Sequence, residues 1–262
     1  MSTNTPTTRI QRTLNGRYID ALTIDFWATI GRDAQVTERR QLRRDLLKPW
    51  FAEYGVELND DEVYDLLQKH AAAWRDSWLK KQYTPTARDA VDWLCGELKI
   101  NPPEAERDTM AQRIDDTLKD FPPVPVGGAI EAIRKLGEEF PLALICDTGL
   151  SGGRNIAGML ETWGIRDLFT TLVFSDAVGV SKPHPKMFHT ASEGLGVPRN
   201  RLVHIGDRED TDIKGAKSFG MAAIRFDGAR LEAQCGPCSM ADNVVDTWEE
   251  IVDILLGNDN DG

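Results

Sequence analysis

The chain from residue 127 onward alternates short apolar runs with segments of helical periodicity, and this alternation limits the possible folds more than any other feature. Each run spans four or five residues, which suits a strand buried on both faces. Helical segments separate the runs, so the strands are expected to lie parallel in one sheet with helices on both faces. The predicted strands are 142–146, 171–174, 202–206 and 222–226, and the predicted helices are 127–140, 151–163, 185–195 and 212–219.

The first 121 residues have a different character. An apolar run at 18–25 is rich in β-branched residues and predicts one more buried strand. After it, the chain between the turn Gly31-Arg32-Asp33 and the proline-rich segment 122–125 shows only helical spacing. Ser, Thr, Asn, Asp or Pro stand near the start of each helical segment, as helix entry requires. The predicted helices are 36–54, 60–81, 85–98 and 103–121.

These patterns together predict an α/β fold with an inserted helical part. Residues 18–32 and 122–262 would form a Rossmann-like core in which a parallel sheet lies between two layers of helices. Residues 33–121, the helical insertion, would form an all-helical domain. The polar residues 1–17 show little periodicity and are predicted to be a mobile leader.

Composition excludes several classes of protein. The chain has 262 residues, of which 41% are hydrophobic and 28% charged, so it can bury a core and is neither collagen-like nor wholly disordered. Its net charge of −11 disfavours nucleic acid and anionic membranes as partners. It has no run of about 18 apolar residues that would span a membrane. The N-terminus lacks the apolar segment of a secretory signal, so we expect a cytoplasmic protein without a disulfide framework among its four cysteines.

Charged residues stand where the predicted strands end. Asp25 ends the first strand, Asp147 follows the second, and Asp207 follows the fourth, with Asp212 five residues later. Lys182 lies in another loop of the same alternating region. Parallel strands deliver their carboxyl ends to one edge of a sheet, so we expect these side chains to meet there. Crowded carboxylates repel one another unless a cation intervenes, and their oxygen ligands favour Mg²⁺.

Four short segments, in this order, resemble the motifs of the haloacid dehalogenase superfamily of phosphatases and hydrolases. They are Asp25-Phe26-Trp27-Ala28-Thr29, Cys146-Asp147-Thr148, Ser181-Lys182-Pro183 and Gly206-Asp207-Arg208-Glu209-Asp210-Thr211-Asp212. Each alone is a weak signal, but four within an alternation of strands and helices indicate the fold. The resemblance covers residues 18–32 and about 122–255, and the helical insertion is similar to the type 1 cap domain of this superfamily.

The resemblance implies a role for each carboxylate. Asp25 would be the nucleophile that attacks phosphorus and forms an aspartyl-phosphate. A Mg²⁺ cofactor would be held by Asp25, by the backbone carbonyl of Trp27, by Asp207 directly, and by Asp212 through water or as an orienting group. The residues alone also allow a simpler interpretation, in which Asp25 caps a turn and Asp212 is the N-cap of the helix that follows it.

The resemblance also implies how the phosphoryl group would be held. Lys182 would neutralise the nucleophile and the transferring group, although by itself it could be an exposed loop lysine. Thr29, Cys146, Asp147 and Thr148 would bind phosphate oxygens through side chains or backbone N–H groups. The superfamily usually has Ser or Thr where this chain has Cys146. A thiol is a weak donor, so Thr148 or the backbone would take over, and Cys146 is more simply a small buried residue.

Trp27 is the most consequential departure from the superfamily pattern. Phosphatases of the superfamily typically have Asp at this place, which protonates the leaving group and activates water; such catalysis contributes about 10²–10⁴ in rate. Three explanations stay open: a good leaving group, a substitute group from the helical insertion, or a weak or non-catalytic protein. Dehalogenating members also lack this Asp, but they generally do without the metal that Asp207 and Asp212 imply.

Other candidate residues have simpler interpretations. Arginines on a solvated helix face and tryptophans in a helical core are commoner than substrate contacts, although both could bind a substrate tail. Cys235 and Cys238 form a CxxC pair, which we interpret as part of a surface loop rather than a redox or zinc site. His204 lies in a strand pattern and is interpreted as structural. The candidates on the two helices are Arg39, Arg40, Arg43, Arg44, Trp74, Arg75 and Trp78.

We therefore hypothesise a Mg²⁺-dependent hydrolase of the haloacid dehalogenase type, a phosphatase of a small phosphorylated metabolite that acts through Asp25. One alternative is a metal-independent, dehalogenase-type hydrolase of a small organic acid. The other is a non-catalytic binding protein with the same fold. A small molecule is the expected partner, with no nucleic acid and no membrane, and the oligomeric state is left open.

Overall fold

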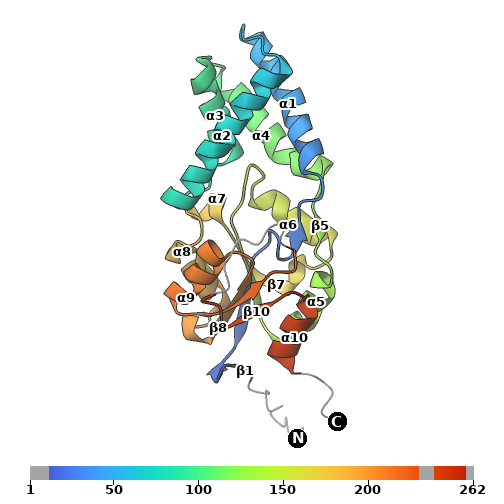
Figure 1. Ribbon diagram of the computed structural model, residues 1–262, viewed down its shortest axis with the longest axis vertical. Coiled ribbons are helices and arrows are strands. Elements are labelled where there is room, and N and C mark those ends of the chain that lie inside the picture. The colour runs from blue at the N-terminus through green and yellow to red at the C-terminus, as the bar shows by residue number, and fades with distance from the viewer. Residues whose placement is uncertain (1–11, 230–238, 258–262) are drawn as a thin grey trace, which may run out of the picture.

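The computed structural model describes residues 12–229 and 239–257, and it contains one parallel sheet of six strands (Figure 1). The strand order is β10-β9-β8-β3-β6-β7, and all neighbouring strands run parallel. The strands are β3 (Ala21–Ile24), β6 (Leu142–Cys146), β7 (Phe169–Phe174), β8 (Leu202–Gly206), β9 (Ala222–Phe226) and β10 (Asn243–Val245). Three have the predicted bounds; β3 is shorter than predicted, β7 begins two residues earlier, and the prediction misses β10.

Helices cover both faces of the sheet because successive side chains of a strand point to opposite sides. In β6, Leu142 and Leu144 pack into the apolar core on one face, whereas Ala143 and Ile145 pack into a separate core on the other. A strand buried on both faces needs no polar residue, which explains its continuous apolar run. The predicted α/β fold is therefore confirmed. One face carries α5 (Ala129–Glu139), α6 (Gly153–Thr162) and α10 (Trp248–Leu256), and the other α8 (Pro185–Leu195) and α9 (Lys214–Phe219).

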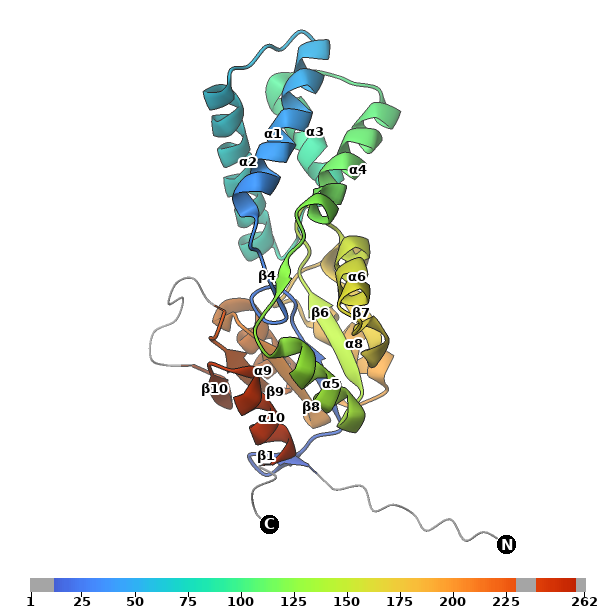
Figure 2. The same ribbon diagram turned by 90° about the vertical axis from the view of Figure 1, so that its right-hand side faces the viewer.

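The helical insertion consists of α1 (Val36–Glu53), α2 (Asp60–Lys81), α3 (Ala87–Leu98) and α4 (Glu104–Asp120). Figure 2 shows these helices beyond one end of the sheet, opposite β1. The chain enters and leaves through β4 (Gly31–Arg32) and β5 (Val124–Pro125), which pair antiparallel. Capping boxes at Asn59 and Thr86 fix the starts of α2 and α3. None of the described helices is both long and apolar enough to span a bilayer.

Residues 13–18 form a hairpin, which differs from the expected unstructured leader of residues 1–17. β1 (Thr13–Leu14) pairs antiparallel with β2 (Arg17–Tyr18). The connecting Asn15 and Gly16 have φ of 49° and 75°, and an Asn-Gly pair favours this two-residue turn because both residues tolerate positive φ. The rest of the expected leader, residues 1–11, lies outside the described residues, as does the pair Cys235 and Cys238.

The remaining short elements connect the larger ones. The predicted helix 212–219 is regular only from Lys214, because a π-helical turn, Glu209–Ile213, precedes α9. This turn carries Asp212 at the carboxyl edge of the sheet, next to the end of β8. The others are α7 (Ser175–Val178) and the 3₁₀ turns Arg166–Leu168 and Arg199–Arg201.

Candidate active site

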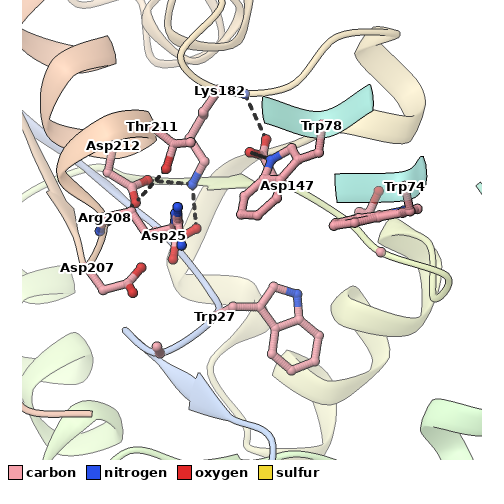
Figure 3. Close-up of a pocket in the computed structure, with 13 residues that line it drawn as sticks. Asp25, Trp27, Trp74, Trp78, Asp147, Lys182, Asp207, Arg208, Thr211 and Asp212 are labelled. Carbon is pink, nitrogen blue, oxygen red and sulfur yellow. Dashed lines mark hydrogen bonds and ion pairs between the residues drawn. The ribbon is translucent and has the colours of Figure 1, made fainter. Parts of the chain in front are cut away.

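Three carboxylates meet at the carboxyl edge of the sheet (Figure 3). Asp25 follows β3, Asp207 follows β8, and Asp212 lies in the π-helical turn. All three residues are buried, and one carboxylate oxygen of each lies within 4.8 Å of the others. Because β3 and β8 are hydrogen-bonded neighbours, their parallel ends bring these residues together.

Lys182 lies between two of these carboxylates. Its Nζ donates hydrogen bonds to Asp25 Oδ1 at 2.5 Å, to Asp212 Oδ1 at 2.6 Å and to the carbonyl of Ile145 at 3.0 Å. Lys182 is only 2% exposed, so it is not a surface loop lysine. Burial acts to lower the pKa of Lys182, but the nearby Asp212 and Asp25 raise it well above its usual value, so the amine stays protonated.

The two carboxylates that share Lys182 have opposite pKa shifts. Burial raises the pKa of Asp25 well above its usual value; Lys182 opposes this, while Asp212 and Asp207 add to it. Burial also acts to raise the pKa of Asp212, but Lys182 and His204 lower it below its usual value. A cation bound among the three aspartates would offset their repulsion and favour the ionised form of Asp25.

His204 supports Asp212 and is a site residue that the sequence pattern indicates only as structural. Its ring lies fully buried on β8, with Nε2 3.2 Å from Asp212 Oδ1 and Nδ1 2.8 Å from Thr23 Oγ1. Burial lowers the pKa of His204, so a neutral ring with its proton on Nε2 can donate to Asp212 and accept from Thr23. Gly206 leaves room for this packing, because a Cβ there would lie 2.6 Å from Asp212 Cγ.

The carboxylates open into a cavity of about 280 Å³, the carboxylate cavity. Three tryptophans help to line it: Trp27 from the loop after β3, and Trp74 and Trp78 from α2 (Figure 3). The Arg208 guanidinium lies 4.9 Å from the centre of the Trp78 ring. The core and the helical insertion therefore build this cavity together.

The four residues predicted to bind phosphate divide between cavity and core. Asp147 and Thr148 line the cavity. Thr29 and Cys146 are not among its lining residues: Thr29 Oγ1 donates to Asp25 Oδ2 at 3.3 Å, and Cys146 packs into the apolar core. The phosphate contacts expected of these two residues stay predictions. Thr29 orients the nucleophile candidate Asp25, and Cys146 is a small core residue.

Asp147 connects the core to the helical insertion. Its Oδ1 accepts a hydrogen bond from the backbone N–H of Lys182 at 2.9 Å, and its Oδ2 accepts one from Trp78 Nε1 at 2.8 Å. Thr148 is held in turn, because its backbone N–H donates to Ser175 Oγ at 2.9 Å. Asp147 therefore orients Trp78 and the lysine loop, a role that the resemblance does not indicate.

Trp27 brings an indole to the position where superfamily phosphatases carry an acid. Its ring packs edge-on against Phe26 and lines the cavity. Of the described residues in the helical insertion, only Trp74 and Trp78 reach the cavity wall, so the insertion supplies no carboxylate there. The substitute acid considered for the insertion is therefore absent from that wall in the described part of the chain.

The donor set fits a hard divalent cation. Three buried carboxylates lie close together, and two of them pair with one buried ammonium, so these four groups carry net negative charge when ionised. Mg²⁺ binds oxygen ligands and usually takes one or two carboxylates while keeping positions for water and substrate phosphate. Asp25 and Asp207 can supply these carboxylates, and the open cavity beside them leaves room for water and phosphate.

Fold and site together define a parallel-sheet α/β protein with a helical insertion over an acidic, lysine-containing edge of the sheet. The chain belongs to the haloacid dehalogenase-like hydrolase family, whose sequence model matches residues 45–226. Solved structures share the fold. YfnB of Bacillus subtilis, described as a magnesium-bound putative hydrolase of this family, matches with a TM-score of 0.60 and 20% identity, covering 90% of this chain and 98% of that one. A phosphatase of the family from Thermococcus onnurineus matches with a TM-score of 0.64 and 21% identity, covering 92% and 99%.

Curated relatives match shorter stretches. A glyceraldehyde 3-phosphate phosphatase of Methanopyrus kandleri is 45% identical over 63 residues, which are 24% of this chain and 27% of the relative. The pyrimidine 5'-nucleotidase YjjG of Escherichia coli is 35% identical over 99 residues, 37% of this chain and 43% of the relative. The (S)-2-haloacid dehalogenase 2 of Pseudomonas sp. strain CBS-3 is 26% identical over 186 residues, 68% of this chain and 76% of the relative. The matches thus span less than half of the first two relatives.

Proposed function

We propose that this hydrolase is a Mg²⁺-dependent phosphatase of a small phosphorylated metabolite and that Asp25 forms an aspartyl-phosphate. One observation carries the proposal: the Asp25 carboxylate lies buried against the Lys182 ammonium at 2.5 Å, beside Asp207 and Asp212, and borders an open cavity. This arrangement offers a nucleophile, a fixed positive charge and a cation site at one point. The phosphatases and the nucleotidase among the relatives support phosphate esters as the substrate class.

In the proposed first step, a carboxylate oxygen of Asp25 forms a bond to phosphorus as the bond to the leaving oxygen breaks. Thr29 and Lys182 hold the carboxylate in position, and the Lys182 ammonium stabilises negative charge on the transferring group. In the second step, water attacks the acyl phosphate and releases inorganic phosphate and the free Asp25 carboxylate. Asp212, oriented by His204, keeps Lys182 in place throughout.

A Mg²⁺ ion at this edge would be held by Asp25, Asp207 and the backbone carbonyl of Trp27, with Asp212 as an orienting group. When bound, it would supply positive charge that offsets the repulsion between nucleophile and phosphate. Trp27 has no proton to give to a leaving oxygen. We therefore expect the best substrates to be aryl or acyl phosphates, because their leaving groups depart without protonation.

The dehalogenase relative favours a second candidate. It matches a larger share of both chains than the phosphatases do. In addition, Trp27 stands where superfamily phosphatases have an acid, and a dehalogenase does not use that acid. In that reaction, Asp25 would displace halide from carbon and form an ester, which water would hydrolyse. The cluster of three aspartates weighs against this candidate, because the reaction needs no cation at the site.

The deciding experiment measures p-nitrophenyl phosphate and acetyl phosphate hydrolysis with Mg²⁺ and with EDTA. We expect turnover that EDTA abolishes and that Asp25→Asn lowers by more than about 10³-fold, because the amide is not a nucleophile. Asp167→Asn, an exposed change outside the site, is the matched control and should be unaffected. Release of halide from 2-haloacids with EDTA present would support the dehalogenase instead. If wild type and Asp25→Asn are equally inert on all of these substrates, both catalytic candidates fail.

A further inference from the structure

A second cavity, of about 480 Å³, lies within the helical insertion. Four arginines help to line it: Arg40, Arg43 and Arg44 from α1, and Arg75 from α2. We call it the arginine pocket. Residues 40, 43 and 44 share one face of α1 because they are three or four positions apart. The arginine pocket is therefore a groove between two helices of the insertion.

The arginine pocket adjoins the carboxylate cavity. Trp74 and Trp78 line both cavities, so these two rings form a common wall. Their ring centres lie 5.4 Å apart, and both side chains are partly exposed. A single elongated molecule could thus extend from Asp25 past the two indoles into the arginine pocket.

The arginine pocket is lined by cations that form no direct ion pair among the described residues, and Asp33 and Asp115 act on Arg43 only from outside its lining. No Asp or Glu is among its lining residues, although the whole chain has a net charge of −11. Within residues 12–229 and 239–257, none of the four arginines forms an ion pair. Arg43 donates to Thr117 Oγ1 at 3.1 Å and Arg44 to Gln41, both neutral partners, and the buried Nε of Arg44 has no hydrogen-bond partner in the described structure.

Clustered, partly desolvated cations are unfavourable unless an anion joins them. Burial and the neighbouring Arg39 lower the pKa of Arg43 to about 10. His70 also lines the arginine pocket; it is buried, and its ring packs edge-on against Trp93. An anion would relieve the repulsion, and guanidinium groups bind carboxylate and phosphate with two parallel hydrogen bonds.

We propose that the arginine pocket binds a second anionic group, carboxylate or phosphate, of a substrate whose phosphoryl group is attacked by Asp25. Trp74 and Trp78 would contact the apolar or planar part that joins the two ends. This inference rests on the proposed phosphatase function and narrows its substrates to molecules with anionic groups at both ends.

The test uses linear alkane bisphosphonates of several chain lengths, which cannot be hydrolysed, with Mg²⁺ and isothermal titration calorimetry. Each is compared with the alkyl monophosphonate of equal length. At the chain length that spans both cavities, we expect the bisphosphonate to bind at least tenfold more tightly than the monophosphonate. Two equivalent ends alone would account for only a factor of two. Acetate-terminated alkyl phosphonates, tested at the same length, distinguish a carboxylate from a phosphate as the preferred distal group.

The variants test whether the arginines cause this preference. Arg40→Gln with Arg75→Gln changes two exposed side chains and should reduce the preference to about twofold, with folding intact. Arg43→Gln should reduce it as well. Arg113→Ala, an exposed arginine on α4 outside the arginine pocket, should leave the preference unchanged. A preference that survives in the Gln variants, or equal binding of the two ligand series at every length, overturns the inference.

Turnover of p-nitrophenyl phosphate, which has a single anionic group, reports the proposed function separately. If wild type hydrolyses it in an Asp25-dependent manner while both phosphonate series bind equally, only the arginine pocket inference fails. If wild type hydrolyses no phosphate ester, the proposed function fails, and with it the assignment of the arginine pocket to a substrate.

Discussion

Among single residues, Trp27 has the largest consequence for the reaction. The loop after β3 places it next to Asp25, and its ring forms part of the cavity wall. An indole can shape the cavity and exclude water, but it cannot protonate a leaving oxygen. Under the proposed function, the identity of this one side chain would set which leaving groups can depart.

Replacing Trp27 by Asp should restore an acid at this place. We expect Trp27→Asp to raise the rate on alkyl phosphates, by up to about 10²-fold, and to change the rate on p-nitrophenyl phosphate little, because that leaving group needs no proton. Trp27→Asn is the matched control, since it has the same size but cannot act as an acid. Equal rates for both variants on alkyl phosphates would contradict the explanation.

Among single elements, α6 shows how closely the site is supported. Gly153, in its first turn, lies against Phe174 at the end of β7: a Cβ there would be 2.3 Å from the Phe174 ring. The loop that carries Asp147 and Thr148 leads directly into this helix. A larger residue at position 153 would therefore move both the helix start and the cavity wall.

Two glycines of α6 make a matched pair of stability predictions. Gly153→Ala should lower the free energy of unfolding by about 1–3 kcal/mol, because the added methyl overlaps the partly buried Phe174 ring. Gly158→Ala should raise it by about 0.5–1 kcal/mol, because alanine favours the helix and nothing lies within 4 Å of the new Cβ. Urea unfolding measures both. The packing argument fails if both changes shift the free energy in the same direction.

At the scale of the whole molecule, contacts at several places hold the helical insertion over the core. Next to the site, Trp78 Nε1 donates to Asp147, and the backbone N–H of Ser181 donates to the Gln82 carbonyl at 2.8 Å. Farther away, Arg154 of α6 pairs with Asp116 of α4 at 2.8 Å. The contacts of Trp78 and Gln82 hold the end of α2 across the carboxyl edge of the sheet, where Trp74 and Trp78 line the carboxylate cavity.

The free energy of unfolding of the whole molecule should depend on Mg²⁺. A ligand that binds only the folded chain stabilises it by about 2.7 kcal/mol at one hundred times its Kd. We expect Mg²⁺ to raise the Tm and EDTA to lower it again to the value measured without Mg²⁺. Asp207→Asn should lose this rise, because it removes one of the three carboxylates that would hold the cation. Thermal unfolding measures the Tm of both proteins. An equal rise in Tm with Mg²⁺ in wild type and in Asp207→Asn would rule out the proposed cation site.

The parts of this protein that depend on local pattern can be predicted from its amino-acid sequence. The period of the apolar residues predicts β3, β6, β7, β8 and β9 and the helices between them, although it misses β10, α7 and α10. Parallel strands must end at one edge, so the meeting of Asp25, Asp207 and Asp212 follows from their positions at or just after strand ends. The Asn-Gly turn at residues 15 and 16 was equally local, although the polar composition around it concealed the hairpin.

The side chains that share a cavity, in contrast, could not be predicted before the packing of the folded chain was known. Cys146 lies in a site motif, yet its side chain packs into the core, whereas His204 lies in a core strand and reaches Asp212. Trp78 meets Asp147 across 69 positions of sequence. The physical reason is that a side chain's neighbours depend on how distant elements pack, and no local period carries that information.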